Sequence, residues 1–178
     1  MPQTNPETFY ISPTPHVPNS KFPVLVYRNV FSDPTPDSIQ ESIEKNDWLT
    51  GGTWGPYKNS HFHSVTHECY AIYQGSSRLQ LGKGPLDGKG GVEVDVAKGD
   101  VIVLPAGTAH CSLSSDGGYE YMGLYPKGSP KWDNNWCKAG PEETESKAQN
   151  ARSVPIPQCD PLYGSDGPLV NLWTKAAA

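Results

Sequence analysis

The sequence predicts a single all-β domain, a barrel or sandwich of short strands, and three observations lead to this fold class. The chain has 178 residues, a length typical of one domain with a substantial core. Its 18 glycines and 18 prolines divide it into short segments, which argues against a helical bundle. Between residues 48 and 128, short apolar or alternating runs follow one another with Gly-rich turns between them, without a strand–helix–strand rhythm.

The N-terminal part predicts an arm, a strand and a helix in that order. Residues 1–20 contain five prolines and predict an extended arm that is ordered only where it docks. His16 in this arm is interpreted as a solvated residue rather than a metal ligand. The run Phe22–Tyr27 is rich in β-branched and aromatic residues and predicts the first strand. A helix capped by Thr35 is expected to follow and to end near Asn46.

Further strands are expected in the central region. One of them, Val92–Val96, alternates valines with acids, which predicts one buried and one solvent-exposed face. The segment Gly75–Ser77 is expected to close the first central strand as a turn. The predicted central strands are Glu68–Gln74, Arg78–Gly82, Val92–Val96, Val101–Leu104 and Tyr119–Tyr125.

The C-terminal part is expected to lie outside the barrel. Residues 130–150 predict an irregular connector that leads into a polar helix around Glu142–Asn150. The stretch from Val154 to Trp173 is expected to be too rich in proline and glycine for regular structure and to pack back along the barrel. We therefore expect an arm (1–20), one domain (21–175) with its barrel core at 48–128, and a cloning remnant at Ala176–Ala178.

Composition excludes several classes of function. The net charge is -5 and no stripe of lysine or arginine is present, so nucleic acid is not an expected partner. No run approaches the roughly 18 apolar residues that span a bilayer. The first residues lack a signal-peptide pattern, and a cytoplasmic location is expected. No C-x-x-C pair occurs among Cys69, Cys111, Cys137 and Cys159, so a zinc site of the finger type is not expected. In a reducing compartment we expect four free thiols.

Three histidines and one carboxylate form a candidate metal site. His61 and His63 lie two residues apart, so both side chains leave the same face of a β-strand. Glu68 follows shortly after, and His110 comes after the turn Pro105–Gly107. Three imidazoles and a carboxylate suit a divalent ion such as Fe, Mn, Ni or Zn. A lone His-x-His pair is often a surface accident, whereas the whole set favours a metal site.

The spacing around these residues resembles the two motifs of the cupin superfamily. Gly55 is followed by five residues and His61, and Glu68 by six residues and Gly75; Gly99 is followed by five residues and Pro105. The resemblance covers residues 55–114 and departs from the second motif at Ser114, where Asn often stands. It implies that the metal ligands are His61, His63, Glu68 and His110.

More narrowly, the chain resembles the small single-domain cupins of the YjlB type. The segments that carry this resemblance are Phe22–Arg28, His63–Glu68 and Asp160–Leu169. The resemblance implies an all-β, single cupin (jelly-roll-like) β-barrel with a short N-terminal helix and a C-terminal helix or tail packed outside. It does not specify a reaction, because the function of that group is poorly defined.

Several neighbours of the ligands are candidate site residues. His67 adjoins Glu68 and would point to the opposite face of a strand, so a structural role is favoured over that of an acid–base helper. Trp54 and Tyr57 precede the ligands and are interpreted as lid or stacking residues at the barrel mouth. Tyr70 and Ser112 share the faces of Glu68 and His110 and are the remaining candidates for substrate binding, although Tyr70 also fits the barrel core. No catalytic residue beyond the ligands is assigned.

These observations leave several functions open. We expect a metal-dependent enzyme that acts on a small organic molecule, and the resemblance to cupin dioxygenases favours an oxidoreductase of the Fe(II)-type dioxygenase class. A non-redox metal would instead support an isomerase, decarboxylase or cyclase. Two further functions stay open, namely a non-catalytic small-molecule-binding module and a metal-free, epimerase-like cupin. A homodimer that exchanges its proline-rich arms is also expected.

Overall fold

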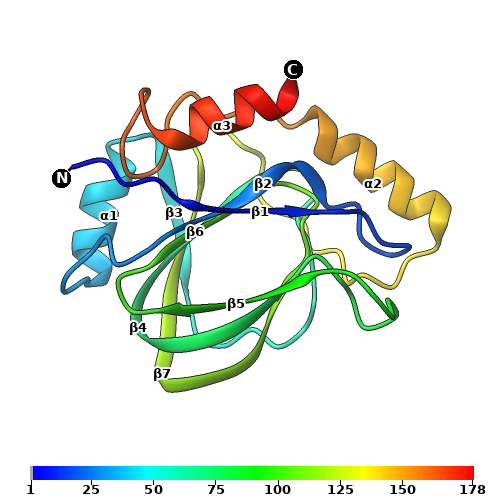
Figure 1. Cartoon of the computed structure of the whole chain (residues 1–178), viewed down its shortest axis with the longest axis horizontal. Coiled ribbons are helices and arrows are strands. Elements are labelled where there is room, and N and C mark those ends of the chain that lie inside the picture. Colours follow the sequence, from blue (N-terminus) through cyan, green and yellow to red (C-terminus); the bar gives the residue numbers. More distant parts are fainter. Residues whose placement is uncertain (1) are drawn as a thin grey trace.

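The protein is built on one curled antiparallel sheet with helices packed outside it (Figure 1). The computed structural model describes residues 2–178. Its seven-stranded sheet has the order β1-β2-β6-β4-β7-β3, and β5 pairs with β4. This confirms the predicted all-β class with helices outside. The elements are β1 (Glu7–Ile11), β2 (Ser20–Tyr27), α1 (Pro36–Glu44), β3 (Trp48–Trp54), β4 (Glu68–Leu81), β5 (Val92–Ala97), β6 (Val101–Leu104), β7 (His110–Pro126), α2 (Pro141–Ser153) and α3 (Pro168–Ala177).

Two long bent strands, β4 and β7, pair with each other and with three further strands of the sheet. The prediction that β4 would be two strands divided by a turn is wrong, because β4 continues through Gly75. Gly75 has φ +67°, and a Cβ there would lie 2.4 Å from the Asp116 carbonyl oxygen, so glycine lets the chain bend while it stays paired. The first half of β4 pairs with β6 and the second half with β5. Likewise β7 begins at His110, well before the predicted Tyr119.

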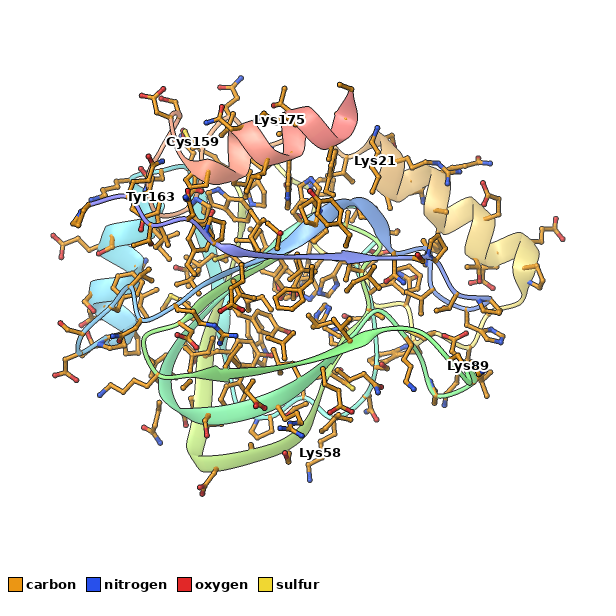
Figure 2. The ribbon with its side chains drawn as sticks, viewed as in Figure 1. Lys21, Lys58, Lys89, Cys159, Tyr163 and Lys175 are labelled. Atoms are coloured by element: carbon orange, nitrogen blue, oxygen red, sulfur yellow. The ribbon has the colours of Figure 1, made fainter. Side chains whose placement is uncertain are left out.

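The alternating sides of β4 serve two cores. Cys69 and Ala71 lie in the core between the sheet and the helices α1 and α3, together with Trp173. Tyr70 and Ile72 lie in the core inside the curled sheet. Charged side chains such as Lys58 and Lys89 project outward from loops at the rim of the molecule (Figure 2). This period-two division points Glu68, the first residue of β4, into the barrel interior.

Two of the helices match the predictions. Helix α1 starts after Thr35, whose side chain accepts a hydrogen bond from the Ser38 backbone N–H, and it ends at Glu44, two residues before Asn46. Helix α2 (Pro141–Ser153) contains the predicted polar helix.

The C-terminal helix α3 corrects a prediction. The stretch after Val154 is irregular only as far as Gly167, because Pro168 occupies the first helical turn, where proline is well tolerated. Leu169 and Trp173 are fully buried against the sheet, and the helix runs through Ala177. The last turn of this helix includes Ala176 and Ala177.

The N-terminal arm is partly a strand of the sheet. Residues Glu7–Ile11 form β1 and pair with β2 of the same chain. His16 is half-buried, and its Nδ1 lies 2.8 Å from the Ala139 carbonyl oxygen, so its interpretation as a solvated residue is wrong. The four cysteines are free, as predicted. No helix within residues 2–178 is long and apolar enough to cross a membrane.

Candidate metal centre

The predicted ligands meet where the start of β7 lies beside the segment before β4. His61 and His110 form an isolated antiparallel bridge, in which the His110 N–H donates to the His61 carbonyl at 2.9 Å. Phe62 forms a second bridge, with Asn135. His61 and His63 therefore lie in an extended segment outside the regular strands, and not on one barrel strand as expected. His110 follows the turn at Gly107, whose φ is +91°.

Each of the three histidines is oriented by its Nδ1 atom. His61 Nδ1 lies 2.9 Å from the Asn59 carbonyl oxygen. His63 Nδ1 lies 2.5 Å from that of Asp133, and His110 Nδ1 lies 3.1 Å from that of Thr108. A carbonyl only accepts hydrogen bonds, so each Nδ1 carries a proton, and Nε2 is the nitrogen left to bind a metal. This tautomer is the one that a metal ligand requires.

The same three imidazoles form a compact buried cluster. One nitrogen from each of His61, His63 and His110 lies within 4.8 Å of the others. All three residues are at most 4% exposed. Nε2 of His110 is buried and makes no hydrogen bond of good geometry, and its nearest acceptor is the Glu68 carboxylate, 3.1 Å away. The three donors therefore fit a divalent cation.

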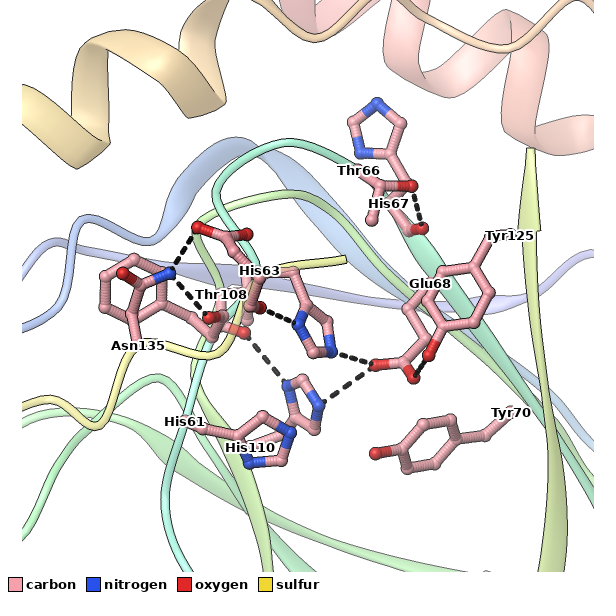
Figure 3. Close-up of polar contacts among 12 residues, drawn as sticks. His61, His63, Thr66, His67, Glu68, Tyr70, Thr108, His110, Tyr125 and Asn135 are labelled. Atoms are coloured by element: carbon pink, nitrogen blue, oxygen red, sulfur yellow. Dashed lines mark hydrogen bonds and ion pairs between the residues drawn. The ribbon is translucent and has the colours of Figure 1, made fainter. Parts of the chain in front are cut away.

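Glu68 places a carboxylate oxygen between two of these imidazoles. Its Oε2 lies 2.9 Å from His63 Nε2 and 3.1 Å from His110 Nε2 (Figure 3). The other oxygen, Oε1, accepts a hydrogen bond of 2.6 Å from the Tyr125 hydroxyl. Glu68 is 3% exposed, so its charge needs partners on every side. The structure thus brings the fourth predicted residue to the same point as the histidines.

The charges in this cluster depend on one another. Burial, reinforced by nearby His110, lowers the pKa of His61 to about 3 and keeps this imidazole neutral. Burial also opposes a charge on His63, but the Glu68 carboxylate outweighs it and raises the His63 pKa. Burial by itself would raise the pKa of Glu68, but the neighbouring His63 and His110 outweigh it and lower this pKa. The buried carboxylate is therefore matched to a positive charge at this point, which a bound cation also supplies.

A loop far away in the sequence supports His63. The backbone carbonyl of Asp133 receives the Nδ1 proton of His63. The Asp133 carboxylate accepts hydrogen bonds from the Ser64 backbone N–H at 2.8 Å and from the Ser64 hydroxyl at 2.6 Å. It also accepts one from the Asn135 side chain at 2.8 Å. The sequence-based interpretation took this segment for an irregular connector and missed Asp133, which carries no motif signal.

His67 has a structural position. It is 1% exposed, and its ring packs 4.7 Å from that of Trp173 on the helix side of the sheet. Its Nδ1 accepts a hydrogen bond from the Ala106 N–H at 2.9 Å, and its Nε2 lies 3.1 Å from the Pro155 carbonyl. Both ring nitrogens are thus occupied by the backbone, away from the metal centre.

A cavity of about 220 Å³ opens beside the cluster. Three of the four predicted substrate-binding residues, Trp54, Tyr57 and Tyr70, line it. The fourth, Ser112, lines a much smaller adjoining void and lies 2.6 Å from Ser77, hydroxyl to hydroxyl. Sequence reasoning missed the other wall residues, although Tyr121 and Tyr125 alternate on one face of β7 and offered a signal. The cavity is lined by Trp54, Tyr57, His61, His63, Glu68, Tyr70, Tyr121, Tyr125, Trp132 and Asn134.

The way in which the sheet places the histidine cluster identifies the fold. A curled antiparallel sheet brings the segment 55–75 and the segment 99–110 together at one buried histidine cluster, as the resemblance of their spacing implied. The chain is a cupin-fold protein. This cupin is 28% identical to the uncharacterized protein YjlB of Bacillus subtilis (strain 168) over 170 residues, which cover 95% of this chain and 97% of YjlB. No family model matches the chain.

Solved structures similar to this cupin include proteins of several kinds. RmlC from Streptococcus suis is 11% identical, with a TM-score of 0.36, and the match covers 70% of this chain and 72% of RmlC. A mutant of the Bacillus subtilis oxalate decarboxylase OxdC is 17% identical, with a TM-score of 0.37 and 94% of this chain covered. The chain spans 43% of the decarboxylase. An 11S globulin from Wrightia tinctoria is 16% identical, with a TM-score of 0.37, and the match covers 49% of this chain and 20% of the globulin.

Proposed function

We propose that this cupin is a metal-dependent enzyme that acts on a small organic molecule held in the cavity beside His61, His63, Glu68 and His110. The observation that carries the proposal is the shared orientation of the histidines: every Nδ1 faces a backbone carbonyl, and the buried donors converge on one point. Both ring nitrogens of His67 contact the backbone, whereas Nε2 of His63 and Nε2 of His110 face a carboxylate that can itself bind a cation.

The residues of the site divide the work. His61, His63 and His110 would hold the metal through Nε2, with Glu68 as the anionic ligand. Tyr125 would fix the second oxygen of Glu68. The aromatic wall, buried at Tyr70, Tyr121 and Tyr125, would keep water from the inner side of the substrate. When bound, a metal in such a site polarises a substrate oxygen or, if it is redox-active, supports reaction with O₂.

The finer proposal is an Fe(II)-type dioxygenase, an oxidoreductase. Three imidazoles and one carboxylate suit Fe(II) as well as Mn, Ni or Zn. The cavity lies directly against the ligand set, so a substrate and O₂ would meet there away from bulk water. A non-redox metal would make the same site a Lewis-acid centre for an isomerase, decarboxylase or cyclase. Anaerobic loading with Fe(II), followed by measurement of O₂ uptake with candidate substrates, separates these reactions.

The ligand set is tested by calorimetric titration of chelator-treated protein with Zn(II). We expect one site per chain, and we expect His110→Ala and Glu68→Gln to weaken binding by at least about tenfold. His16→Ala is the matched control, because it removes an imidazole whose contact is outside the cluster. If the wild type, His110→Ala and His16→Ala bind zinc equally, the proposal is wrong.

A further inference from the structure

The wall of the cavity beside the metal centre is dominated by rings. Six of its ten lining residues are tryptophan or tyrosine. The other four are His61, His63, Glu68 and Asn134. Lysine, arginine, serine and threonine do not occur among these lining residues of the described chain. The wall therefore offers no cation for a second anionic group, and the hydroxyls among these lining residues are those of four tyrosines.

The tyrosine hydroxyls of this wall are mostly occupied by other wall residues. Tyr125 donates its hydroxyl to Glu68 at 2.6 Å. Tyr121 donates its hydroxyl to that of Tyr70 at 3.3 Å, and these two rings stack with centroids 3.9 Å apart. With these hydroxyls engaged, the wall presents the faces and edges of rings to a ligand.

The rings hold one another in place. Tyr125 and Trp132 are stacked with centroids 4.6 Å apart and an angle of 8° between their planes. Trp54 meets Trp132 edge to face, with centroids 5.9 Å apart. Such pairs are favourable geometries and restrict each ring to one orientation. The cavity is therefore a preformed slot rather than a loose apolar patch.

Two glycines on neighbouring strands make room for these rings. A Cβ on Gly51 of β3 would lie 2.4 Å from the Tyr125 ring and 3.1 Å from the Trp132 ring. A Cβ on Gly123 of β7 would lie 2.6 Å from the Trp54 ring. Neither glycine has the positive φ that would require it for backbone reasons. Their place in the sheet is explained by the close approach of the aromatic wall.

The size of the cavity limits the ligand. Its volume of about 220 Å³ lies below the range of about 300–1,000 Å³ that is typical of pockets for drug-sized ligands. One substituted ring fills a volume of this size, whereas a nucleotide or a disaccharide would extend beyond it. The ligand must also reach the metal, and three of the four proposed metal ligands, His61, His63 and Glu68, line the same cavity.

From these observations we infer that the substrate is a small planar aromatic molecule that binds the metal through one or two oxygen atoms while its ring lies against the wall formed by Trp54, Tyr121 and Trp132. This inference rests on the proposed function, because the metal supplies the polar anchor. It adds a substrate class that neither the ligand set nor the fold specifies.

The test compares three hydroxamates that share one metal-binding group. Zinc-loaded protein is titrated with benzohydroxamate, cyclohexanecarbohydroxamate and acetohydroxamate, and each affinity is compared with that for zinc in solution. The benzene ring should strengthen binding about tenfold over the saturated ring and over the methyl group, since ring-to-ring contacts add about 1 kcal/mol or more beyond burial. Trp132→Ala should remove most of that preference. Because Trp132 stacks on Tyr125, the zinc affinity of the variant is measured separately, and each hydroxamate affinity is taken only from zinc-saturated protein.

The matched control is Trp136→Ala. Trp136 lies in the same loop and is 45% exposed, but it is not part of the cavity wall, so its removal should leave the ring preference unchanged. Equal binding of the three hydroxamates to zinc-loaded protein overturns the aromatic substrate class and leaves the metal site standing. If the protein binds no zinc, the proposed function fails. The affinities of metal-free protein for phenol and for cyclohexanol then decide whether the cavity prefers an aromatic ring to a saturated one.

Discussion

The Tyr125 hydroxyl lies 2.6 Å from Glu68 Oε1, while Oε2 of the same carboxylate lies between His63 and His110. One oxygen of Glu68 is thus held by the wall of the cavity, and the other faces the imidazoles. A carboxylate held in this way can offer a cation one oxygen in a fixed direction. The aromatic wall and the metal centre are therefore joined at Glu68.

Removal of the Tyr125 hydroxyl should weaken metal binding. Tyr125→Phe keeps the ring stacked on Trp132 but leaves Glu68 Oε1 without its donor. Loss of such a supporting hydrogen bond typically weakens metal affinity by about 10- to 100-fold, and we expect about tenfold. Tyr121→Phe, whose lost hydroxyl contacts Tyr70 and not Glu68, serves as control in the same zinc titration. Equal affinities for the two variants would contradict this role of Tyr125.

The loop around Asp133 should matter to the metal centre although it supplies no ligand. Asp133→Ala removes the carboxylate that binds Ser64 and thereby frees the carbonyl that orients His63. We expect zinc affinity to fall by about tenfold. Lys147→Ala is the control, because its ammonium only approaches Asp133 to 3.6 Å at the partly exposed side. If Asp133→Ala bound zinc as tightly as Lys147→Ala, the support would be unnecessary.

His67 should make the free energy of unfolding depend on pH. Burial lowers its folded-state pKa to about 4, whereas an unfolded histidine has a pKa of about 6.5. Between these values the unfolded chain binds a proton that the folded protein does not bind. Stability from the neutral ring is therefore fully present above about pH 6.5 and is lost as the pH falls toward 4, by up to about 3 kcal/mol.

The variant that isolates this effect is His67→Gln. Its amide can accept from the Ala106 N–H and donate to the Pro155 carbonyl, but it does not titrate. Urea unfolding of both proteins at pH 7 and pH 5 should show a smaller loss of stability for the variant. Identical losses would mean that His67 does not titrate on unfolding as we describe.

A homodimer is predicted from the proline-rich arm. Within the described chain, β1 of the arm pairs with β2 of the same molecule, so exchange of this strand between two copies is the simplest way to form the dimer. Light scattering should give twice the chain mass of 19.4 kDa. Deletion of residues 2–11 should shift the mass toward that of one chain. A full-length protein of one chain mass would exclude the homodimer.

The residues of the candidate metal centre could be predicted from the sequence because their spacing is local. His61, His63 and Glu68 lie within eight residues, and His110 follows a proline–glycine turn whose geometry the residue types specify. The side of the sheet on which each side chain after Glu68 lies was also predictable. Side chains alternate along β4, so Cys69 and Tyr70 enter different cores.

Other parts of the site could not be predicted, because they depend on contacts between distant segments. Asp133 reaches His63 across 70 residues through an irregular loop, and its key atom is a backbone carbonyl that any residue could supply. Trp132 enters the cavity from the same loop. The continuity of β4 through Gly75 depends on simultaneous pairing with β7, which local turn signals do not reveal. Tertiary contacts decided all three.

The central claim is that the histidine cluster binds a divalent metal in the protein as it is made. The most direct measurement is the metal content of freshly purified protein to which no metal has been added. This content is determined by inductively coupled plasma mass spectrometry. We predict close to one divalent metal per chain in the wild type and almost none in the double variant His61→Ala/His110→Ala. Equal, low metal contents in the two proteins would contradict the claim.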